Sequence, residues 1–187
     1  MLDKKLLRKE IQRKLSSIPK SQYEQLSSMV ASHLFKDEDY QKAETVGITI
    51  SRAPEVDTYK IISRAWKDGK KIVVPKCNPR ERTMIFREIQ SFDQLEMVYY
   101  GLLEPIVEKT RAVEKKEIEL LIVPGLGFTP DGGRLGFGGG FYDRFLQDFR
   151  NPLLALAFEE QIVSQIPMES HDIRIPKIIT EKGYVKR

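Results

Sequence analysis

The sequence has few residues that could build a thiolate cage or a histidine cluster. Its 187 residues include one cysteine, Cys77, and two histidines, His33 and His171. A single cysteine cannot form an internal disulfide, and a structural zinc site needs several ligands. We therefore interpret Cys77 as structural and His171 as an exposed loop residue. The G-x-S-x-G motif is also absent, so Ser-His-Asp hydrolysis has no support.

Long hydrophobic runs are missing too. No apolar stretch approaches the roughly 20 residues that cross a bilayer, and the charged start MLDKKLLRKE is followed by no apolar region of a signal peptide. With 41% hydrophobic and 31% charged residues, the composition is that of a globular protein. Membrane, collagenous and disordered classes are excluded, and we expect a cytoplasmic protein.

Positive charge is only in slight excess. The formal net charge is +4 and the isoelectric point is near 9.0, which favours an anionic partner such as nucleic acid, phosphate or carboxylate. A nucleic-acid-binding module is the weakest of these interpretations. The basic residues concentrate on one short predicted helix, without the interleaved aromatic residues of RNA readers.

Helical periodicity dominates the first part of the chain. Residues 3–16 place Leu6, Leu7, Ile11 and Leu15 at helical spacing, with Asp3 as N-cap. A second helix is predicted over about 21–35, which makes residues 1–36 an N-terminal helical arm. The outer face of the first helix is basic, and it is either a solvated face or an anion contact: Lys4, Lys5, Arg8, Lys9, Arg13 and Lys14.

From Thr45 the pattern changes to short apolar runs that are typical of buried strands. Strands are predicted at 45–51 and 71–76, with a helix between them that ends at Gly69, and this order indicates a parallel βαβ unit. Further strands are predicted within 83–89, 118–124, 152–158 and 175–180, and a helix over 141–149. The predicted fold is α/β: a single domain over 1–187 with an open, mainly parallel sheet covered by helices on both faces.

Glycine is concentrated in one segment. Eight of the twelve glycines lie between Gly125 and Gly140, after a predicted strand and before a predicted helix. Glycine lets backbone N–H groups approach a ligand closely, so this segment is a natural anion site. The P-loop and Rossmann motifs are absent, which disfavours P-loop NTPases and Rossmann dehydrogenases.

Two charged residues accompany the glycines. Arg134 offers a bidentate donor to phosphate or carboxylate. Asp143, in the first turn of the predicted helix, either stabilises the helix dipole or binds a metal. A carboxylate beside a phosphate requires a cation between them, and Mg²⁺ would satisfy this requirement.

Four segments together resemble the 5-formyltetrahydrofolate cyclo-ligase family, also called 5,10-methenyltetrahydrofolate synthetase. They are KKLLRKEIQRKL, SRAPEVDT, VPGLGFTPDGGRLGFGGGFYDRFL and ALAFEEQIVSQIPMESHD. The resemblance implies conversion of 5-formyltetrahydrofolate, with or without a polyglutamate tail, to 5,10-methenyltetrahydrofolate. It also implies that ATP is the co-substrate, that Mg²⁺ is required, and that ADP and phosphate are released.

The resemblance assigns roles by position. Lys4, Arg8 and Arg134 are the implied catalytic cations, and Asp143 and Asp172 the implied metal ligands. The implied folate contacts are Ile50, Glu55, Tyr100, Phe137, Gly138, Gly139, Gly140 and Phe141. The implied ATP contacts are Lys4, Lys5, Leu6, Leu7, Arg8, Arg134, Leu135, Gly136, Phe137, Gly138, Gly139, Gly140, Phe141 and Tyr142.

Some family members carry basic residues in the glycine run where this chain has Phe137 and Gly139, which leaves Arg134 as the loop cation. Lys76, Arg80 and Arg82 are candidates for contact with an anionic polyglutamate tail. We expect a monomer. An alternative interpretation is a sugar-phosphate isomerase or coenzyme A transferase-like enzyme that uses a similar scaffold without nucleotide turnover.

Overall fold

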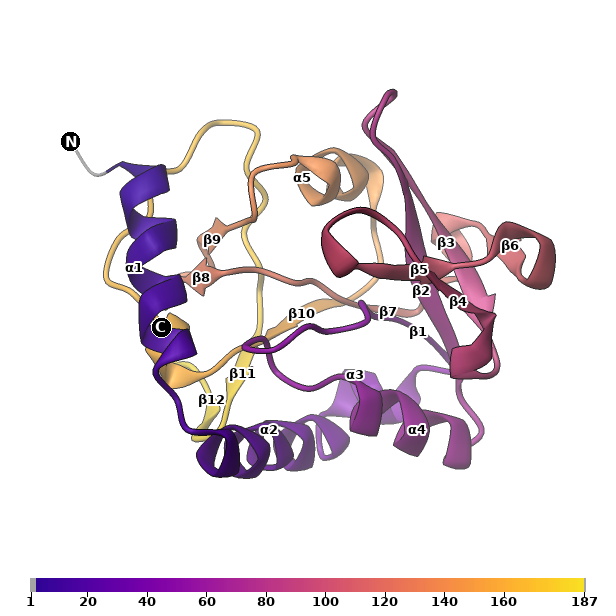
Figure 1. The fold of residues 1–187 in the computed structure, drawn as a ribbon, viewed down its shortest axis with the longest axis horizontal. Coiled ribbons are helices and arrows are strands. Elements are labelled where there is room, and N and C mark those ends of the chain that lie inside the picture. Colours follow the sequence, from indigo (N-terminus) through magenta and orange to yellow (C-terminus); the bar gives the residue numbers. More distant parts are fainter. Residues whose placement is uncertain (1–2, 187) are drawn as a thin grey trace.

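An eight-stranded sheet forms the centre of the fold (Figure 1). The computed structural model describes residues 3–186, so Met1, Leu2 and Arg187 of the predicted domain 1–187 and arm 1–36 lie outside it. The eight strands have the order β12-β11-β10-β7-β1-β2-β3-β6. They are β1 (Thr45–Gly47), β2 (Lys71–Asn78), β3 (Thr83–Ile89), β6 (Arg111–Val113), β7 (Leu120–Ile122), β10 (Leu153–Leu156), β11 (Ile178–Thr180) and β12 (Gly183–Tyr184).

The middle of this sheet is parallel and its edges are antiparallel. Strands β11, β10, β7, β1 and β2 pair in parallel, whereas β12, β3 and β6 add in antiparallel orientation. The predicted parallel pairing of 45–51 with 71–76 is confirmed, with Val46 opposite Ile72. Two small sheets lie outside: β4 (Leu95–Met97) with β5 (Leu103–Pro105), and β8 (Gly127–Phe128) with β9 (Arg134–Leu135).

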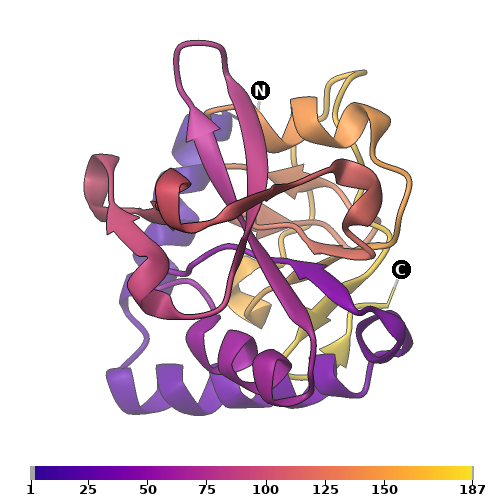
Figure 2. The ribbon, with the colours of Figure 1, turned by 90° about the vertical axis from the view of Figure 1, so that its right-hand side faces the viewer.

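Helices cover both faces of the sheet, as predicted. Ile72 and Val74 of β2 face one buried cluster and Val73 faces the other, because successive strand residues point to opposite sides. The first cluster contains residues of α1, α2 and α4, and the second contains Phe145 and Leu146. Figures 1 and 2 show α2 and α4 below the sheet and α5 above it. The α-helices are α1 (Lys4–Ser16), α2 (Lys20–Phe35), α3 (Glu38–Lys42), α4 (Tyr59–Lys67) and α5 (Phe141–Phe145).

Local signals set the helix ends. The carboxylate of Asp3 accepts from the backbone N–H of Lys5, which confirms the predicted N-cap of α1. Gly69 follows α4 with φ +78°, a left-handed conformation that ends helices. Short 3₁₀ turns complete the connections: η1 (Phe92–Gln94), η2 (Tyr99–Gly101), η3 (Val107–Lys109), η4 (Lys115–Glu117), η5 (Leu146–Asp148) and η6 (Glu159–Gln161).

Two predicted elements are shorter in the structure. The strand predicted over 45–51 ends at Gly47, because beyond it the Thr58 hydroxyl donates to the carbonyl of Thr49, and Ser51 and Thr58 exchange side-chain-to-backbone hydrogen bonds. These side-chain contacts replace ladder pairing. The helix predicted over 141–149 divides into α5 and the turn η5.

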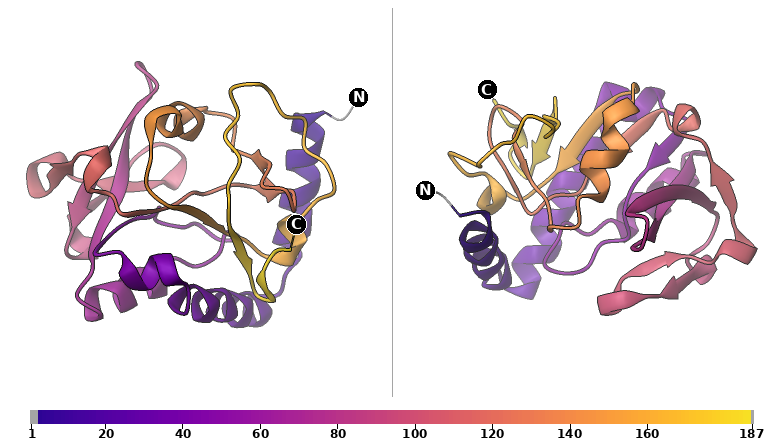
Figure 3. Two further views of the ribbon diagram at one scale, coloured as in Figure 1. Left: turned by 180° about the vertical axis from the view of Figure 1, so that it is seen from behind. Right: turned by 90° about the horizontal axis from the view of Figure 1, so that it is seen from above.

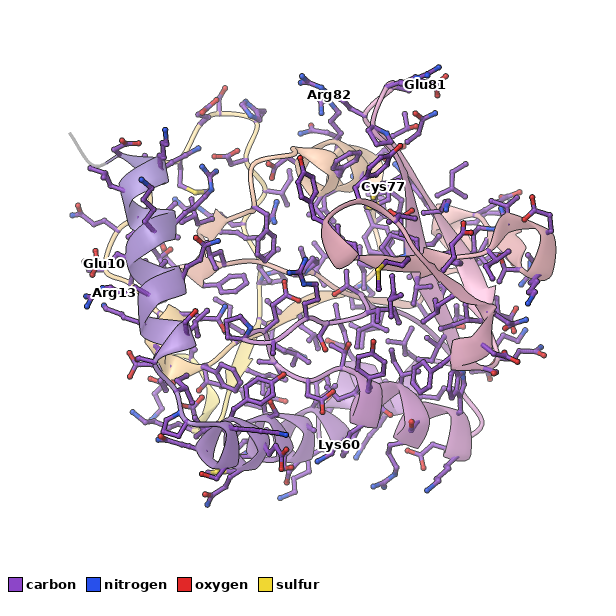
Figure 4. The ribbon with its side chains drawn as sticks, viewed as in Figure 1. Glu10, Arg13, Lys60, Cys77, Glu81 and Arg82 are labelled. Atoms are coloured by element: carbon purple, nitrogen blue, oxygen red, sulfur yellow. The ribbon has the colours of Figure 1, made fainter. Side chains whose placement is uncertain are left out.

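The β2–β3 hairpin projects from the body. Figure 4 shows Glu81 and Arg82 at its tip, whereas Cys77 lies lower on the same hairpin, within the fold. Arg82 has φ 54° at the turn. Glu10 and Arg13, by contrast, lie on the side of α1 turned away from the sheet. Within residues 3–186, no helix has the length and apolar character needed to cross a membrane.

Candidate functional site

The glycine-rich segment follows β7 and contains a hairpin. After Gly125 the chain forms β8, turns back into β9, and then runs through Gly136–Gly140 to α5. Gly132 at the hairpin turn has φ +92°, and a Cβ there would lie 2.4 Å from the carbonyl oxygen of Ile175. Gly138 and Gly140 also have positive φ, +109° and +71°. Glycine is required at these positions by conformation.

Helix α1 docks against this segment. The guanidinium of Arg8 donates from Nε to the carbonyl oxygen of Gly136 at 2.8 Å. Ile11 is fully buried, and its Cδ1 lies 2.6 Å from the position of a Cβ on Gly127, so a larger residue there would displace Ile11. The basic helix therefore contacts the glycine segment directly.

The residues from Lys4 to Arg8, which are predicted to contact the nucleotide, differ in their exposure to solvent. Lys4 reaches across to the loop before β11, where its Nζ lies 3.3 Å from Oε1 of Glu169 and 3.6 Å from Oδ2 of Asp172. Leu6 is 64% exposed and Lys5 is also exposed, whereas Leu7 packs partly against the core. Figure 3 shows the loop before β11 beside α1 from behind.

Arg134 points inward. Its side chain is only 5% exposed; Nη1 donates to the carbonyl of Pro124 at 3.0 Å, and Nη2 lies 2.8 Å from Oδ1 of Asp143. Its Nε and the hydroxyl of Tyr142 are buried without a hydrogen-bond partner. Burial raises the pKa of the Tyr142 hydroxyl, with a further contribution from the neighbouring Cys77.

A pocket that is open to solvent lies beside the glycine run at the carboxyl ends of β1 and β7. Phe137 and Glu55 both line it, so the structure brings together two predicted folate contacts. Ile50 is 8% exposed and belongs to the hydrophobic core, and its neighbours Thr49 and Ser51 reach the pocket instead.

Glu55 is a partly buried carboxyl beside this pocket. Burial raises its pKa, although the backbone N–H of Arg52 donates to Oε2 at 2.9 Å. The hydroxyl of Tyr23 donates to the Glu55 carbonyl at 2.7 Å and fixes the backbone. Tyr100 is 89% exposed with φ 57°, and its carbonyl accepts from the Arg52 guanidinium, which holds the β4–β5 hairpin near the Glu55 loop.

The two predicted metal ligands come from neighbouring segments. The side-chain amide of Gln147 donates to the carbonyls of Asp143 at 3.2 Å and His171 at 3.0 Å, which joins α5 to the loop that carries Asp172. Asp172 also accepts from the backbone N–H of Glu169 at 2.8 Å. In the part of the chain described, three or more His, Cys, Asp or Glu side chains nowhere gather into a metal site. His171 is exposed, as predicted.

The family model for 5-formyltetrahydrofolate cyclo-ligases matches residues 1–181. The chain belongs to this family. It is 29% identical to the 5-formyltetrahydrofolate cyclo-ligase of Mus musculus, over 95% of this chain and 93% of the relative, and 29% identical to that of Escherichia coli K12, over 90% and 94%. The resemblance inferred from the four segments is confirmed, and the chain is an enzyme of the ligase class.

Solved structures agree with this cyclo-ligase assignment. The 5,10-methenyltetrahydrofolate synthetase of Aquifex aeolicus superimposes with a TM-score of 0.86 at 26% identity, covering 98% of this chain and 92% of that one. The synthetase of Mycoplasma pneumoniae gives 0.79 at 22% identity, over 96% and 99%, and shows the same fold.

Two residues at the candidate site were not predicted from the sequence. Gln161 is 3% exposed and lines the pocket; its amide donates to the carbonyls of Gly125 at 3.1 Å and Leu126 at 3.0 Å, so it fixes the entry to the glycine segment. Arg144 places Nη1 3.2 Å from the Cβ position of Gly140. Its place directly after Asp143 was the only available signal.

The three basic residues predicted to contact a polyglutamate tail differ in whether they form ion pairs. Lys76 contacts Glu96 at 2.9 Å and Glu104 at 3.4 Å, so its charge is already neutralised. Arg80 and Arg82 are exposed and form no ion pair with any residue from 3 to 186. Burial and the nearby Glu104 raise the pKa of Cys77 to about 12, which keeps the thiol protonated and supports its structural interpretation.

Proposed function

We propose that this enzyme catalyses the ATP-dependent cyclisation of 5-formyltetrahydrofolate to 5,10-methenyltetrahydrofolate, with release of ADP and phosphate. One observation carries the proposal beyond family membership. Phe137 lines the Glu55 pocket, while the preceding residue, Gly136, accepts a hydrogen bond from Arg8. A single glycine run therefore borders both a pocket for a flat heterocycle and a group of cations for phosphates.

The reaction needs two bond exchanges and no enzyme nucleophile. The formyl oxygen attacks the γ-phosphorus of ATP, the bond to ADP breaks, and N5 carries a phosphorylated formyl group as an iminium. N10 then attacks the formyl carbon, phosphate leaves, and N10 loses its proton. Phosphoryl transfer of this kind depends mainly on positioning and charge neutralisation.

The chain offers groups for each task. Lys4, Arg8 and Arg134 supply positive charge near the phosphates, together with the backbone N–H groups of the run from Gly136 to Gly140. Arg144, beside Gly140, supplies a further cation to a run that contains no basic residue of its own. Glu55, with its raised pKa, is suited to a pterin edge, which has both donors and acceptors.

Asp143 and Asp172 fit Mg²⁺ in the chemistry of their donors. Mg²⁺ is commonly held by one or two carboxylates plus phosphate oxygens and water, and two carboxylates are what the linked segments offer. When bound, Mg²⁺ would neutralise charge on the phosphate oxygens.

The hairpin tip supports a smaller proposal. Arg80 and Arg82 stay available for an anionic polyglutamate tail, while Lys76 is already paired with two carboxylates. The monomeric state and the cytoplasmic location stay predictions.

Absorbance at the methenylfolate band tests the function. We expect the band to grow only when protein, 5-formyltetrahydrofolate, ATP and Mg²⁺ are all present, with phosphate released in step. Arg134→Ala should lower kcat by about two orders of magnitude, as the loss of one electrostatic donor does, whereas Arg111→Ala on the distant edge strand β6 should leave it unchanged. Growth of the band without ATP, or no growth at all, would contradict the proposal and favour a reaction without nucleotide turnover.

A further inference from the structure

Each proposed metal ligand is paired with a proposed phosphate cation. Asp143 Oδ1 lies 2.8 Å from Nη2 of Arg134, and Asp172 Oδ2 lies 3.6 Å from Nζ of Lys4. The positive charges of Arg134 and Lys4 are therefore directed at carboxylates of the protein itself.

Both pairs are partly removed from solvent. The side chain of Arg134 is 5% exposed and that of Asp172 is 9% exposed. Charges in such surroundings are screened less than fully exposed charges, so each carboxylate reduces the potential that its cation presents to a phosphate. Glu169, the other partner of Lys4, is 61% exposed and has less influence.

We propose that Asp143 and Asp172 make nucleotide binding conditional on a divalent cation. This inference rests on the proposed function. Without a divalent cation, each carboxylate offsets one cation and repels the triphosphate. With a divalent cation present, the carboxylate charges are offset, and Arg134 and Lys4 attract the triphosphate. Nucleotide and cation therefore bind with positive coupling, and the coupling is reciprocal between them.

The test measures the affinity for ATP by isothermal titration calorimetry, without folate, once in EDTA and once in Mg²⁺. Wild type should bind weakly in EDTA and much more tightly in Mg²⁺. Asp143→Asn and Asp172→Asn should each bind ATP about tenfold more tightly than wild type in EDTA, and should gain less from Mg²⁺. The two variants lie in different segments, so the test stands if either one folds.

Asp148→Asn is the matched control. It removes one negative charge from η5, directly after α5, but its carboxylate is 70% exposed and pairs with Lys115, away from the glycine run. Its affinity for ATP in EDTA should equal that of wild type. This result would show that the aspartate variants act through their pairing with Arg134 or Lys4 and not through the change in net charge.

The outcomes distinguish this inference from the proposed function. If wild type binds ATP equally in EDTA and Mg²⁺, or if neither aspartate variant binds more tightly than wild type in EDTA, the inference is wrong and the proposed function stands. If wild type does not bind ATP even in Mg²⁺, the proposed function is wrong and this inference is wrong with it.

Discussion

Arg8 Nε and the carbonyl oxygen of Gly136 lie 2.8 Å apart, although 128 residues separate them in the sequence. The hydrogen bond orients the guanidinium so that it lies beside Gly138, 3.9 Å from the Cβ position of that residue. Arg8 therefore has two tasks, which are to hold the glycine run and to present positive charge next to it. The first helix forms one side of the candidate site.

Arg8→Gln should raise the KM for ATP roughly tenfold, because a charged hydrogen bond and a phosphate contact are lost together. Lys9→Gln removes the same charge from the exposed side of α1 and should leave the KM unchanged. Steady-state kinetics at saturating folate measure both values. Equal KM values for Arg8→Gln and wild type would contradict the role of Arg8.

Gly127→Ala should destabilise the protein by about 1 to 3 kcal/mol, since its new methyl group would overlap Cδ1 of the buried Ile11. Ile11→Val removes that methyl group, so the double variant should lose less stability than the two single changes predict together. Urea denaturation of the four proteins in the cycle measures the coupling. Additive losses would show that α1 does not pack on Gly127.

Gln161→Leu should cost about 2 to 4 kcal/mol of stability, because the carbonyls of Gly125 and Leu126 lose their donor in a buried place. The exposed Gln165 provides the control, and Gln165→Leu should change stability by less than about 0.5 kcal/mol. Urea denaturation gives both values, and similar losses in the two variants would contradict this role of Gln161.

Asp37 links the α2–α3 junction to the C-terminal strands. Its carboxylate is fully buried and accepts from Lys177 at 2.6 Å and Tyr184 at 2.6 Å. Burial alone would raise its pKa, but these hydrogen bonds and one from the Tyr40 N–H hold the pKa below its ordinary value of 3.8. The ionised form is thus favoured in the folded state.

Asp37→Asn should destabilise the protein by about 3 kcal/mol at pH 7, because Lys177 loses a buried partner. A lowered folded-state pKa gives stability that is present above the unfolded pKa of about 3.9 and is lost as pH falls through the folded value. The difference between wild type and variant should therefore shrink below about pH 4 in urea denaturation. Asp39→Asn also removes a partner of Lys177, but at a partly exposed site, and should cost less than about 1 kcal/mol. If the stability difference between wild type and Asp37→Asn did not change with pH, it would contradict the lowered pKa of Asp37 in the folded protein.

Local signals predicted much of the fold. The Asp3 cap and the periodicity of Leu7, Ile11 and Leu15 are read within one helix, and the order of apolar runs from Thr45 predicts the parallel unit of β1 and β2. The β8–β9 hairpin escaped prediction because strands of two residues have no periodicity.

The candidate site was predicted less completely, because its pairings depend on tertiary placement. Nothing local indicates that Arg134 turns inward to Asp143, that Gln161 reaches back to Gly125, or that Ile50 joins the core while Thr49 and Ser51 face the pocket. Arg134 and Asp143 are 9 residues apart in the sequence, and Gln161 and Gly125 are 36 apart. Only the folded chain brings these residues into contact.

The ion pair between Lys4 and Glu169 spans 165 residues. Because the chain is synthesised from its N-terminus, helix α1 leaves the ribosome long before the loop that contacts Lys4 exists. Once Gly136 has left the ribosome, Arg8 can form its hydrogen bond, whereas Lys4 still lacks its partners Glu169 and Asp172. A chain that stops before residue 169 therefore lacks both carboxylates that hold Lys4, Glu169 and Asp172, although it contains the partners of the hydrogen bond between Arg8 and Gly136.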